Sequence, residues 1–308
     1  MTDTLRIATR QSPLALWQAE HVASQLRNLY PDLTVALVGM TTRGDRMLET
    51  PLATIGGKGL FVKELEQGLQ EDRADIAVHS MKDVPVELPT GLHLPVILER
   101  EDPRDAWVSA RFERLGALSL GARVGTASLR RQCQILAHRS DLALLPLRGN
   151  VNTRLKRLDE GRYEGIVLAA AGLIRLGMAD RIRHLMPLEE SLPAIGQGAI
   201  GIECRQGDTR IEALIAPLHH APTAVCVQAE RALNRRLQGG CQVPIAGHAW
   251  LVNETLHLHA LVGHPQGHPL IRDSRQGSLA DAEALGADLG EALLQSGARE
   301  ILDQLLDA

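Results

Sequence analysis

The 308-residue chain has few aromatic residues and no excess of basic charge. Phe, Trp and Tyr make up 2% of it, which argues against the aromatic stacking platforms of single-strand nucleic-acid binders. A net charge of −4 gives no other reason to expect a nucleic-acid partner. No apolar run approaches membrane-spanning length, and residues 1–10 contain no signal-peptide core. We therefore expect a soluble, cytoplasmic protein in which any anion binding is local.

Cysteine is also scarce, and its spacing excludes two common uses. No Cys-x-x-Cys is present, so neither a disulfide framework nor a thiolate metal site is indicated. A loose histidine cluster around His257 and His259, with His264 and His268, fits no structural zinc spacing. The sequence therefore predicts no metal site. The four cysteines to be judged singly are Cys133, Cys204, Cys226 and Cys241.

Short β-like runs alternate with amphipathic helical stretches over the first two thirds of the chain. This pattern predicts an α/β fold with a sheet flanked by helices. In the first lobe it predicts strands at residues 5–9, 34–40 and 75–79 and helices at 12–29 and 61–70. The Gly-rich, charged loop at 41–60 is long enough to be functional or mobile.

A second α/β lobe and a smaller α+β domain follow. The charged, proline-broken segment 99–104 fits a crossing between lobes, and residues 199–204 are expected to return to the first lobe as a strand. In the second lobe we expect strands at 123–126, 142–147 and 165–169, with helices opening near Ser128 and Asn150. In the last part of the chain, the sequence pattern predicts a helix at 223–237, three strands and a helical stretch from 279. The expected domains are 1–98 with 199–216, then 104–192, then 221–308.

Three strand-to-helix junctions each place arginine beside the start of a helix. They contain Arg10 with Ser12, residues 126–131, and Arg148 with Arg154 one turn later. Unpaired N–H groups and the macrodipole at a helix start favour an anion, and such junctions lie at the carboxyl edge of a sheet. We therefore expect a wall that binds carboxylates or phosphates. Residues 123–157 hold eight Lys or Arg and one acid, Asp141, and repetition at cap positions favours a binding site over a solvated basic face.

Asp83 and Lys58 are the next candidates. Asp83 follows a buried-looking strand, where catalytic side chains emerge, and among cations it should stay ionised and could stabilise a developing positive charge or shuttle a proton. A turn or cap aspartate is an equally good interpretation from these residues alone. The run Gly56-Gly57-Lys58-Gly59 lacks P-loop spacing and is interpreted as a hinge that presents one lysine.

Cys241 differs from the other cysteines in its surroundings. It lies in a polar, Gly-Gly-flanked segment and is expected to be exposed, as a reactive thiol must be. The other three have apolar or helical contexts that suit core residues. From the residues alone, an unreactive loop cysteine remains the preferred interpretation.

Six motifs, taken together and in order, resemble the porphobilinogen deaminase family along nearly the whole chain. They are Arg6-Ile7-Ala8-Thr9-Arg10-Gln11-Ser12-Pro13-Leu14-Ala15, Gly57-Lys58-Gly59-Leu60-Phe61-Val62-Lys63-Glu64, Ala77-Val78-His79-Ser80-Met81-Lys82-Asp83-Val84-Pro85, Ser128-Leu129-Arg130-Arg131-Gln132, Leu147-Arg148-Gly149-Asn150 and Gly239-Gly240-Cys241-Gln242-Val243-Pro244. The resemblance implies two lobes like those of periplasmic binding proteins, a discontinuous first domain and a small C-terminal α+β domain.

The resemblance also implies an activity. Cys241 would carry a dipyrromethane cofactor through a thioether, and four porphobilinogen molecules would be added with loss of ammonia before water releases hydroxymethylbilane. The protein would be a monomer. A non-catalytic binding protein for a small organic anion would explain the two lobes and the arginines, but it gives no role to Asp83 or Cys241. A structural or interaction protein would leave the arginines at the helix starts unexplained.

Where a motif of the family matches this chain, the resemblance implies a functional role for the matching residue. Asp83 would be the catalytic group that contacts pyrrole nitrogens and assists loss of the aminomethyl nitrogen. Phe61 and Lys58 would belong to a lid. Thr54 and Ala127 depart from the usual lysine and hydroxyl residue of the family, which affects lid contacts and one carboxylate hydrogen bond. The expected cofactor- and substrate-binding residues are Arg10, Ser12, Gln18, Lys58, Phe61, Lys82, Thr126, Ser128, Arg130, Arg131, Arg148, Gly149, Arg154 and Arg175.

Overall fold

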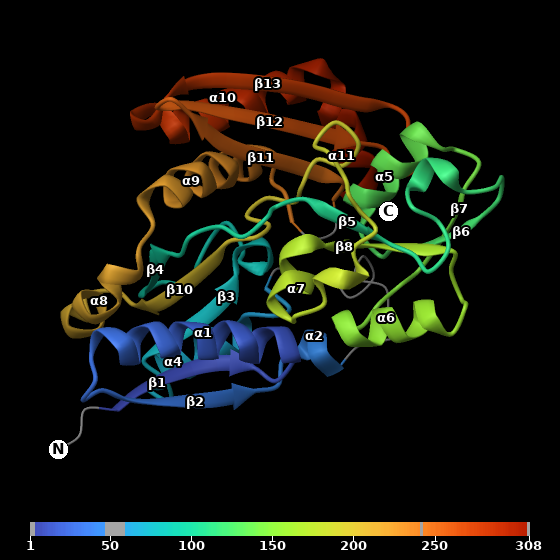
Figure 1. Cartoon of the computed structure of the whole chain (residues 1–308). Helices are drawn as coiled ribbons and strands as arrows, with labels where there is room; N and C mark the ends of the chain where they lie inside the picture. The colour runs from blue at the N-terminus through green and yellow to red at the C-terminus, as the bar shows by residue number, and fades with distance from the viewer. Residues whose placement is uncertain (1–3, 47–58, 241–242, 307–308) are drawn as a thin grey trace. The chain divides into compact units, whose positions relative to one another are not determined.

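A computed structural model of the chain describes residues 4–46, 59–240 and 243–306. By contact the described residues form two compact units: 4–46, 59–101 and 199–224 make up the first, and 102–198 and 225–306 the second. Their strands pair into three sheets (Figure 1). None of the helices in the described ranges is long and apolar enough to cross a membrane.

The first unit is built on a five-stranded sheet of order β2-β1-β3-β10-β4. Strands β1, β2 and β3 are parallel, and β10 runs antiparallel between β3 and β4. The predicted return of the chain at 199–204 is therefore confirmed. The elements are β1 (Thr4–Arg10), α1 (Pro13–Leu29), β2 (Thr34–Met40), α2 (Arg43–Arg46), α4 (Lys63–Gln70), β3 (Ile76–Ser80), η1 (Met81–Asp83), β4 (Leu92–Ile97), β10 (Ile200–Arg205), α8 (Thr209–Ile215) and η4 (Ala216–Leu218).

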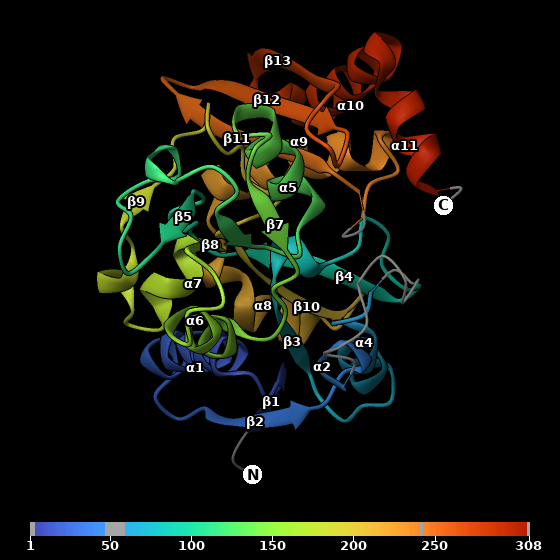
Figure 2. The same cartoon turned by 90° about the vertical axis from the view of Figure 1, so that its right-hand side faces the viewer.

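Alternation along the strands gives this sheet two different faces. On β10, Ile202 and Cys204 face the core formed with α1 and α8, whereas Glu203 faces the side of α4. Figure 2 shows α1 and α4 on opposite sides of β3 and β10. Helix α4 begins two residues later than the sequence predicted, because Gly59, at φ +81°, starts a turn in which the N–H of Lys63 donates to its carbonyl.

The second unit contains a five-stranded sheet of order β7-β6-β8-β5-β9. Its α5 side is filled by Trp107 and Ile135, and its other side by α6 and α7. Strand β7 is shorter than predicted because Pro146, which has no N–H, follows it. The elements are β5 (Asp105–Val108), η2 (Leu115–Ala117), β6 (Arg123–Gly125), α5 (Leu129–His138), β7 (Ala143–Leu145), α6 (Val151–Asp159), β8 (Gly165–Ala169), α7 (Ala170–Arg175), η3 (Ala179–Arg181) and β9 (His184–Leu185).

The rest of the second unit is the predicted small α+β arrangement. A three-stranded antiparallel sheet, β11-β12-β13, shares an aliphatic core with three helices. On its other face, Leu261 and Ala246 pack with Cys133 of α5. The elements are α9 (Ala221–Arg236), β11 (Ile245–Val252), β12 (Thr255–Gly263), β13 (Leu270–Ser278), η5 (Leu279–Asp281), α10 (Ala282–Leu293), the π-helical turn η6 (Leu294–Ala298) and α11 (Arg299–Leu306).

The core of the first unit contains a polar cluster of Glu66, His79 and Glu203. The three residues are at most 6% exposed, and His79 Nε2 lies 2.8 Å from Glu203 Oε2. Burial and the charge of Glu203 raise the pKa of Glu66 to about 7, although His79 and Lys63 oppose the shift. A carboxyl whose pKa is raised by folding contributes stability below its unfolded pKa and loses that contribution as the pH rises through the folded value.

We predict that Glu66→Gln flattens the pH dependence of stability. In the unmodified protein the free energy of unfolding should fall by up to about 3 kcal/mol between pH 4.5 and 7.5 because of this group. Glutamine cannot ionise, so the variant should lose that component. Urea unfolding at several pH values measures it, with the exposed Glu20→Gln as the control. Parallel curves for Glu66→Gln and the unmodified protein would contradict the assignment.

Candidate functional site

The first junction predicted to bind an anion follows β1. Ser12 caps α1 as predicted, because its Oγ accepts a hydrogen bond from the N–H of Ala15. The Arg10 guanidinium forms an ion pair with Asp45 and lies 4.3 Å from the centre of the Phe61 ring. Burial would raise the pKa of Asp45, but hydrogen bonds from Arg10 and Thr42 lower it overall. Arg10 and Phe61, both predicted site residues, are thus brought together.

The turn after β3 carries Lys82 and Asp83, both half-buried. Gln18, 2% exposed, donates from Nε2 to Ser80 Oγ at 2.8 Å. The N–H of Met81 donates to the carbonyl of Ala199 at 3.0 Å. Because β1 and β3 are parallel neighbours, their carboxyl ends place Arg10 and this turn at the same edge of the sheet.

The second junction follows β6. Ser128 caps α5 by accepting from the N–H of Arg131, and Thr126 Oγ1 accepts from the N–H of Ser128 at 3.2 Å. Arg130 and Arg131 are only 5% and 6% exposed. The sequence predicted the cap correctly, but it did not predict that both guanidinium groups would be buried.

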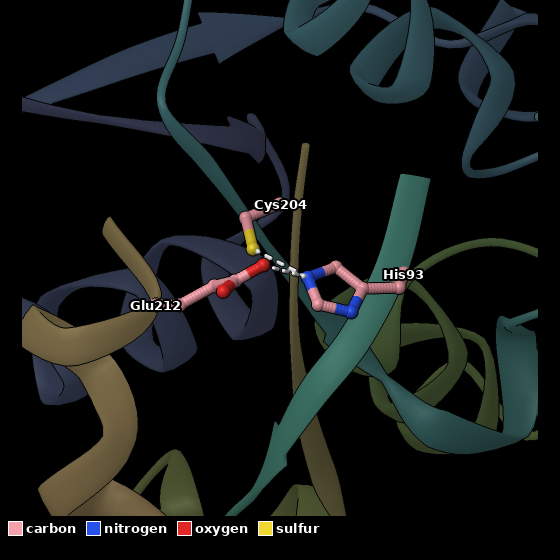
Figure 3. A group of neighbouring side chains, drawn as sticks. All are labelled: His93, Cys204 and Glu212. Carbon is pink, nitrogen blue, oxygen red and sulfur yellow. Dashed lines mark hydrogen bonds and ion pairs between the residues drawn. The ribbon is translucent and has the colours of Figure 1, made fainter. Parts of the chain in front are cut away.

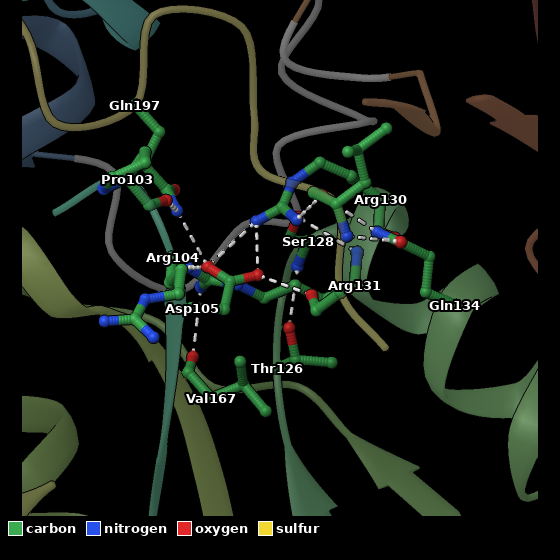
Figure 4. A network of polar contacts seen from close by, with 12 residues as sticks. Pro103, Arg104, Asp105, Thr126, Ser128, Arg130, Arg131, Gln134, Val167 and Gln197 are labelled. Carbon is green, nitrogen blue, oxygen red and sulfur yellow. Dashed lines mark hydrogen bonds and ion pairs between the residues drawn. The ribbon is translucent and has the colours of Figure 1, made fainter. Parts of the chain in front are cut away.

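Both arginines bind the carboxylate of Asp105, the first residue of β5 (Figure 4). Arg130 Nη2 lies 2.8 Å and Arg131 Nη2 2.7 Å from its oxygens, and Ser191 and Gln197 donate two further hydrogen bonds. Burial would raise the pKa of Asp105, but the two guanidinium charges hold it well below its usual range.

Asp105 was missed by the sequence analysis. It directly follows the segment 99–104, which was interpreted as a crossing between lobes, and its only signal was an acidic residue before the apolar run Ala106-Trp107-Val108. Arg131 keeps one buried atom, Nε, for which the described residues offer no hydrogen-bond partner.

The third junction follows β7. Gly149 has φ +107°, and a Cβ there would lie 2.8 Å from Cγ2 of Thr153, so the tight turn requires glycine. Arg154 Nε donates to the carbonyl of Gly149 at 2.7 Å. Arg148 is half-buried, burial lowers its pKa, and its buried Nη1 has no hydrogen-bond partner in the described parts of the chain.

The second and third junctions lie side by side. Strands β6 and β7 are parallel neighbours, and the N–H of Thr126 donates to the carbonyl of Leu145 at 3.0 Å. Arg175, at the end of α7, is 9% exposed and donates from Nη2 to the carbonyl of Gly198 at 2.6 Å. The predicted gathering of arginine-bearing helix starts at one sheet edge is therefore confirmed for the second lobe.

Fewer of the positive charges in the basic window at 123–157 are available to bind an anion than the sequence suggested. Arg123 pairs with Glu164, Arg139 pairs with Asp141, and Arg130 and Arg131 share Asp105. These four cations are thus paired, and three of them pair with acids that lie outside the window, Glu164 and Asp105. The excess of positive charge within this segment is partly neutralised in the folded protein, because acids from other segments pair with its arginines.

Arg148 and Arg131 therefore remain the strongest anion-binding candidates at this edge. Each keeps a buried guanidinium atom with no acceptor among the described residues, and such an N–H suits a charge-assisted hydrogen bond to a carboxylate. Lys58, Thr54 and Cys241 lie outside the described residues. The other three cysteines, Cys133, Cys204 and Cys226, are buried as predicted.

Solved structures with a similar chain course include several ligand-binding proteins. A putative methionine-binding lipoprotein from Bacillus subtilis is 13% identical, with TM-score 0.44 over 71% of this chain and 91% of its own. The aliphatic sulphonate binding protein SsuA from Escherichia coli is 13% identical, with TM-score 0.41 over 77% and 71%. A periplasmic substrate-binding protein from Coxiella burnetii is 13% identical, with TM-score 0.45 over 74% and 96%. Likeness at this level says nothing about the ligand of this chain.

Family matches cover most of the sequence. Residues 5–213 match the porphobilinogen deaminase, dipyromethane cofactor binding domain, and residues 224–295 match the porphobilinogen deaminase, C-terminal domain. The chain therefore belongs to the porphobilinogen deaminase family, the hydroxymethylbilane synthases, which are transferases of tetrapyrrole biosynthesis with a dipyrromethane cofactor.

Proposed function

We propose that this chain performs the family reaction with Cys241 as the cofactor attachment residue, Asp83 as the catalytic residue and arginines at the helix starts as carboxylate ligands. The proposal rests on two buried guanidinium atoms in the second lobe, Arg148 Nη1 and Arg131 Nε, for which the described parts of the chain supply no hydrogen-bond partner. Buried cationic donors without an acceptor are costly unless a ligand supplies one.

The chemistry of these donors fits a dipyrromethane. Each of its rings carries an acetate and a propionate, and the planar fork of arginine binds carboxylates better than lysine does. When bound, the group supplies a tethered chain end to which pyrrole units are added. Arg131 and Arg148 bind its carboxylates, and the Asp105 ion pairs hold Arg131 in a fixed orientation.

Asp83 interacts with the nitrogen atoms of the pyrrole rings and of the leaving aminomethyl group. Its carboxylate accepts hydrogen bonds from pyrrole N–H groups and stabilises positive charge as the aminomethyl nitrogen leaves. The short turn Met81–Asp83 fixes its backbone, because Met81 bonds to Ala199 and Gln18 bonds to the preceding Ser80. Substrate added next to a tethered chain end reacts in an effectively intramolecular step.

The remaining candidates bind the carboxylates of cofactor and substrate or cover them. Phe61 lies over Arg10 and, with Lys58, forms part of a lid. Thr126 and Ser128 present hydroxyl groups at the cap of α5. The other proposed ligands are Arg10, Ser12, Gln18, Lys82, Arg130, Gly149, Arg154 and Arg175.

We extend the proposal to the setting of the reaction. The protein works as a cytoplasmic monomer with porphobilinogen as its substrate and without a nucleic-acid partner, for which its net charge of −4 offers no attraction. Domain 1 spans 1–98 and 199–216, domain 2 spans 104–192, and domain 3, at 221–308, carries the cofactor cysteine.

We predict that Cys241→Ser abolishes the covalent cofactor. Intact mass spectrometry of the purified unmodified protein should show a two-pyrrole adduct, and substrate should add a ladder of species spaced by one pyrrole unit. The variant should show neither, because an alcohol is a far weaker nucleophile than a thiolate. Cys226→Ser, a change at a buried cysteine, should keep both. An adduct that persists in Cys241→Ser would move the attachment to another residue.

We predict that Asp83→Asn lowers kcat about 100-fold or more with little loss of stability. Asparagine keeps the shape but removes the charge that stabilises a cationic transition state. Steady-state kinetics, on protein whose adduct mass and thermal unfolding have been checked, measures the effect. The control is Glu87→Gln, an exposed carboxyl four residues later. A kcat within a few-fold of the unmodified enzyme would assign the catalytic role elsewhere.

We predict that Arg148→Gln raises KM for porphobilinogen by about 10- to 100-fold or prevents cofactor assembly, since a charge-assisted hydrogen bond contributes about 1.5–3 kcal/mol. KM and the adduct mass are the two measurements. Arg162→Gln, at a 60% exposed side chain paired with Glu160, is the matched control. If both variants behave alike, Arg148 does not bind a carboxylate.

A further inference from the structure

Three side chains with different metal-binding atoms meet on the first unit. They come from β4 (His93), β10 (Cys204) and α8 (Glu212), and their ligand atoms all lie within 4.8 Å of one another (Figure 3). His93 Nε2 lies 3.3 Å from Cys204 Sγ and 3.0 Å from Glu212 Oε1. Both other ligand atoms therefore converge on a single ring nitrogen.

These separations match the edges of a tetrahedral zinc site. Zinc bonds of about 2.3 Å to sulfur and about 2.0 Å to nitrogen or oxygen place neighbouring ligand atoms roughly 3.3–3.5 Å apart. The two separations from His93 Nε2, 3.3 Å to sulfur and 3.0 Å to oxygen, are close to that spacing, and all three ligand atoms lie within 4.8 Å of one another. Imidazole, thiolate and carboxylate are also the ligand types that zinc takes in proteins.

Local charge favours a cation at this point. The carboxylates of Glu212 and Asp208 lie close enough to Cys204 to interact with it electrostatically, and Arg205 is the opposing positive charge. A divalent ion that displaces the thiol proton would offset this concentration of negative charge. Glu212 is also oriented, because its Oε1 accepts a hydrogen bond from the N–H of Gly207 at 3.0 Å.

Access and position are both suitable for a structural ion. Cys204 is fully buried, whereas the side chains of His93 and Glu212 are 34% and 29% exposed, so two of the three ligands contact solvent. On β10, Cys204 pairs with Ile76 at the start of β3, and Asp83 follows the other end of that strand. The cluster is therefore at the opposite edge of the sheet from the candidate catalytic turn.

We propose that His93, Cys204 and Glu212 bind one zinc ion, with a water molecule as the fourth ligand. Binding releases the thiol proton to solvent and forms one bond each from zinc to nitrogen, sulfur and oxygen. The ion links β4 to β10 and α8, which lie more than a hundred residues later in the sequence. Its role is to stabilise the return of the chain to the first lobe, separately from the chemistry at Asp83.

The test is a metal titration of the metal-free holoenzyme, in which the proposed thioether occupies the Cys241 sulfur. Zinc is titrated against a chromophoric chelator, and Co²⁺ serves as a spectroscopic probe. We expect one equivalent of metal, intense tetrahedral d–d bands, a sulfur-to-Co²⁺ charge-transfer band and a higher Tm with zinc. Glu212→Gln, at a partly exposed position, should weaken binding about 100-fold or more, as should His93→Gln.

Matched controls separate this site from other residues. Cys226→Ser and Glu20→Gln change a buried cysteine and an exposed carboxyl elsewhere and should leave the affinity unchanged. Cys204→Ser should remove the charge-transfer band, while Glu212→Gln should retain a weaker one at high Co²⁺. Absence of binding, an octahedral Co²⁺ spectrum, or unchanged affinity in Glu212→Gln would overturn the proposal. None of these readouts depends on deaminase activity, so the outcome is independent of the proposed catalytic residues.

Discussion

The buried carboxylate of Asp105 links β5 to the start of α5 and to residues 191–197, and so fixes the sheet edge of the second lobe where the candidate anion-binding arginines lie. It begins β5, it binds the first turn of α5 through two arginines, and it accepts hydrogen bonds from Ser191 and Gln197 in the segment that leads back to the first lobe. Removing one partner from such a buried ionic network typically costs about 3–5 kcal/mol, because the remaining charge is left without compensation. The orientation of Arg131 follows from this constraint.

The same network limits what the arginines can do. Arg130 donates hydrogen bonds to Asp105 and to the carbonyl of Leu192. Arg131 donates one to Asp105 and one to the carbonyl of Val167. Arg148, in contrast, has no acid partner among the described residues and keeps a buried donor. The fold therefore uses most donors of Arg130 and Arg131, whereas Arg131 Nε and Arg148 Nη1 are the buried donors with no hydrogen-bond partner among the described residues.

Discontinuity is the second feature that organises the chain. Strand β10 lies between β3 and β4 in the first sheet, although the chain passes through the whole second lobe before reaching it. It brings Glu203 to His79 on one face of the sheet and Cys204 to His93 near the other, so two clusters of titratable groups exist only because the chain returns. Such non-local pairing involves a larger loss of chain entropy than local contacts do, and interactions across the returning strand offset part of it.

Local sequence determined most elements and the positions of the helix starts. Ser12, Ser128 and Asn150 each cap the helix that the sequence assigned to them, because a cap bond joins residues only two or three positions apart. Strand alternation and turn residues likewise predicted the three-stranded sheet near the C-terminus. The family motifs are runs of neighbouring residues, so they too could be identified from the sequence.

Tertiary structure decided which of these residues are paired, buried or left with an open donor. Asp105 and Arg131 are 26 residues apart, and His93 and Cys204 are 111 apart, so no local pattern relates them. The basic window appeared unbalanced for the same reason, since its acids come from other segments. Sequence periodicity reports which face of an element is apolar, whereas the partner of a charged group depends on which distant segments the sheet order brings together.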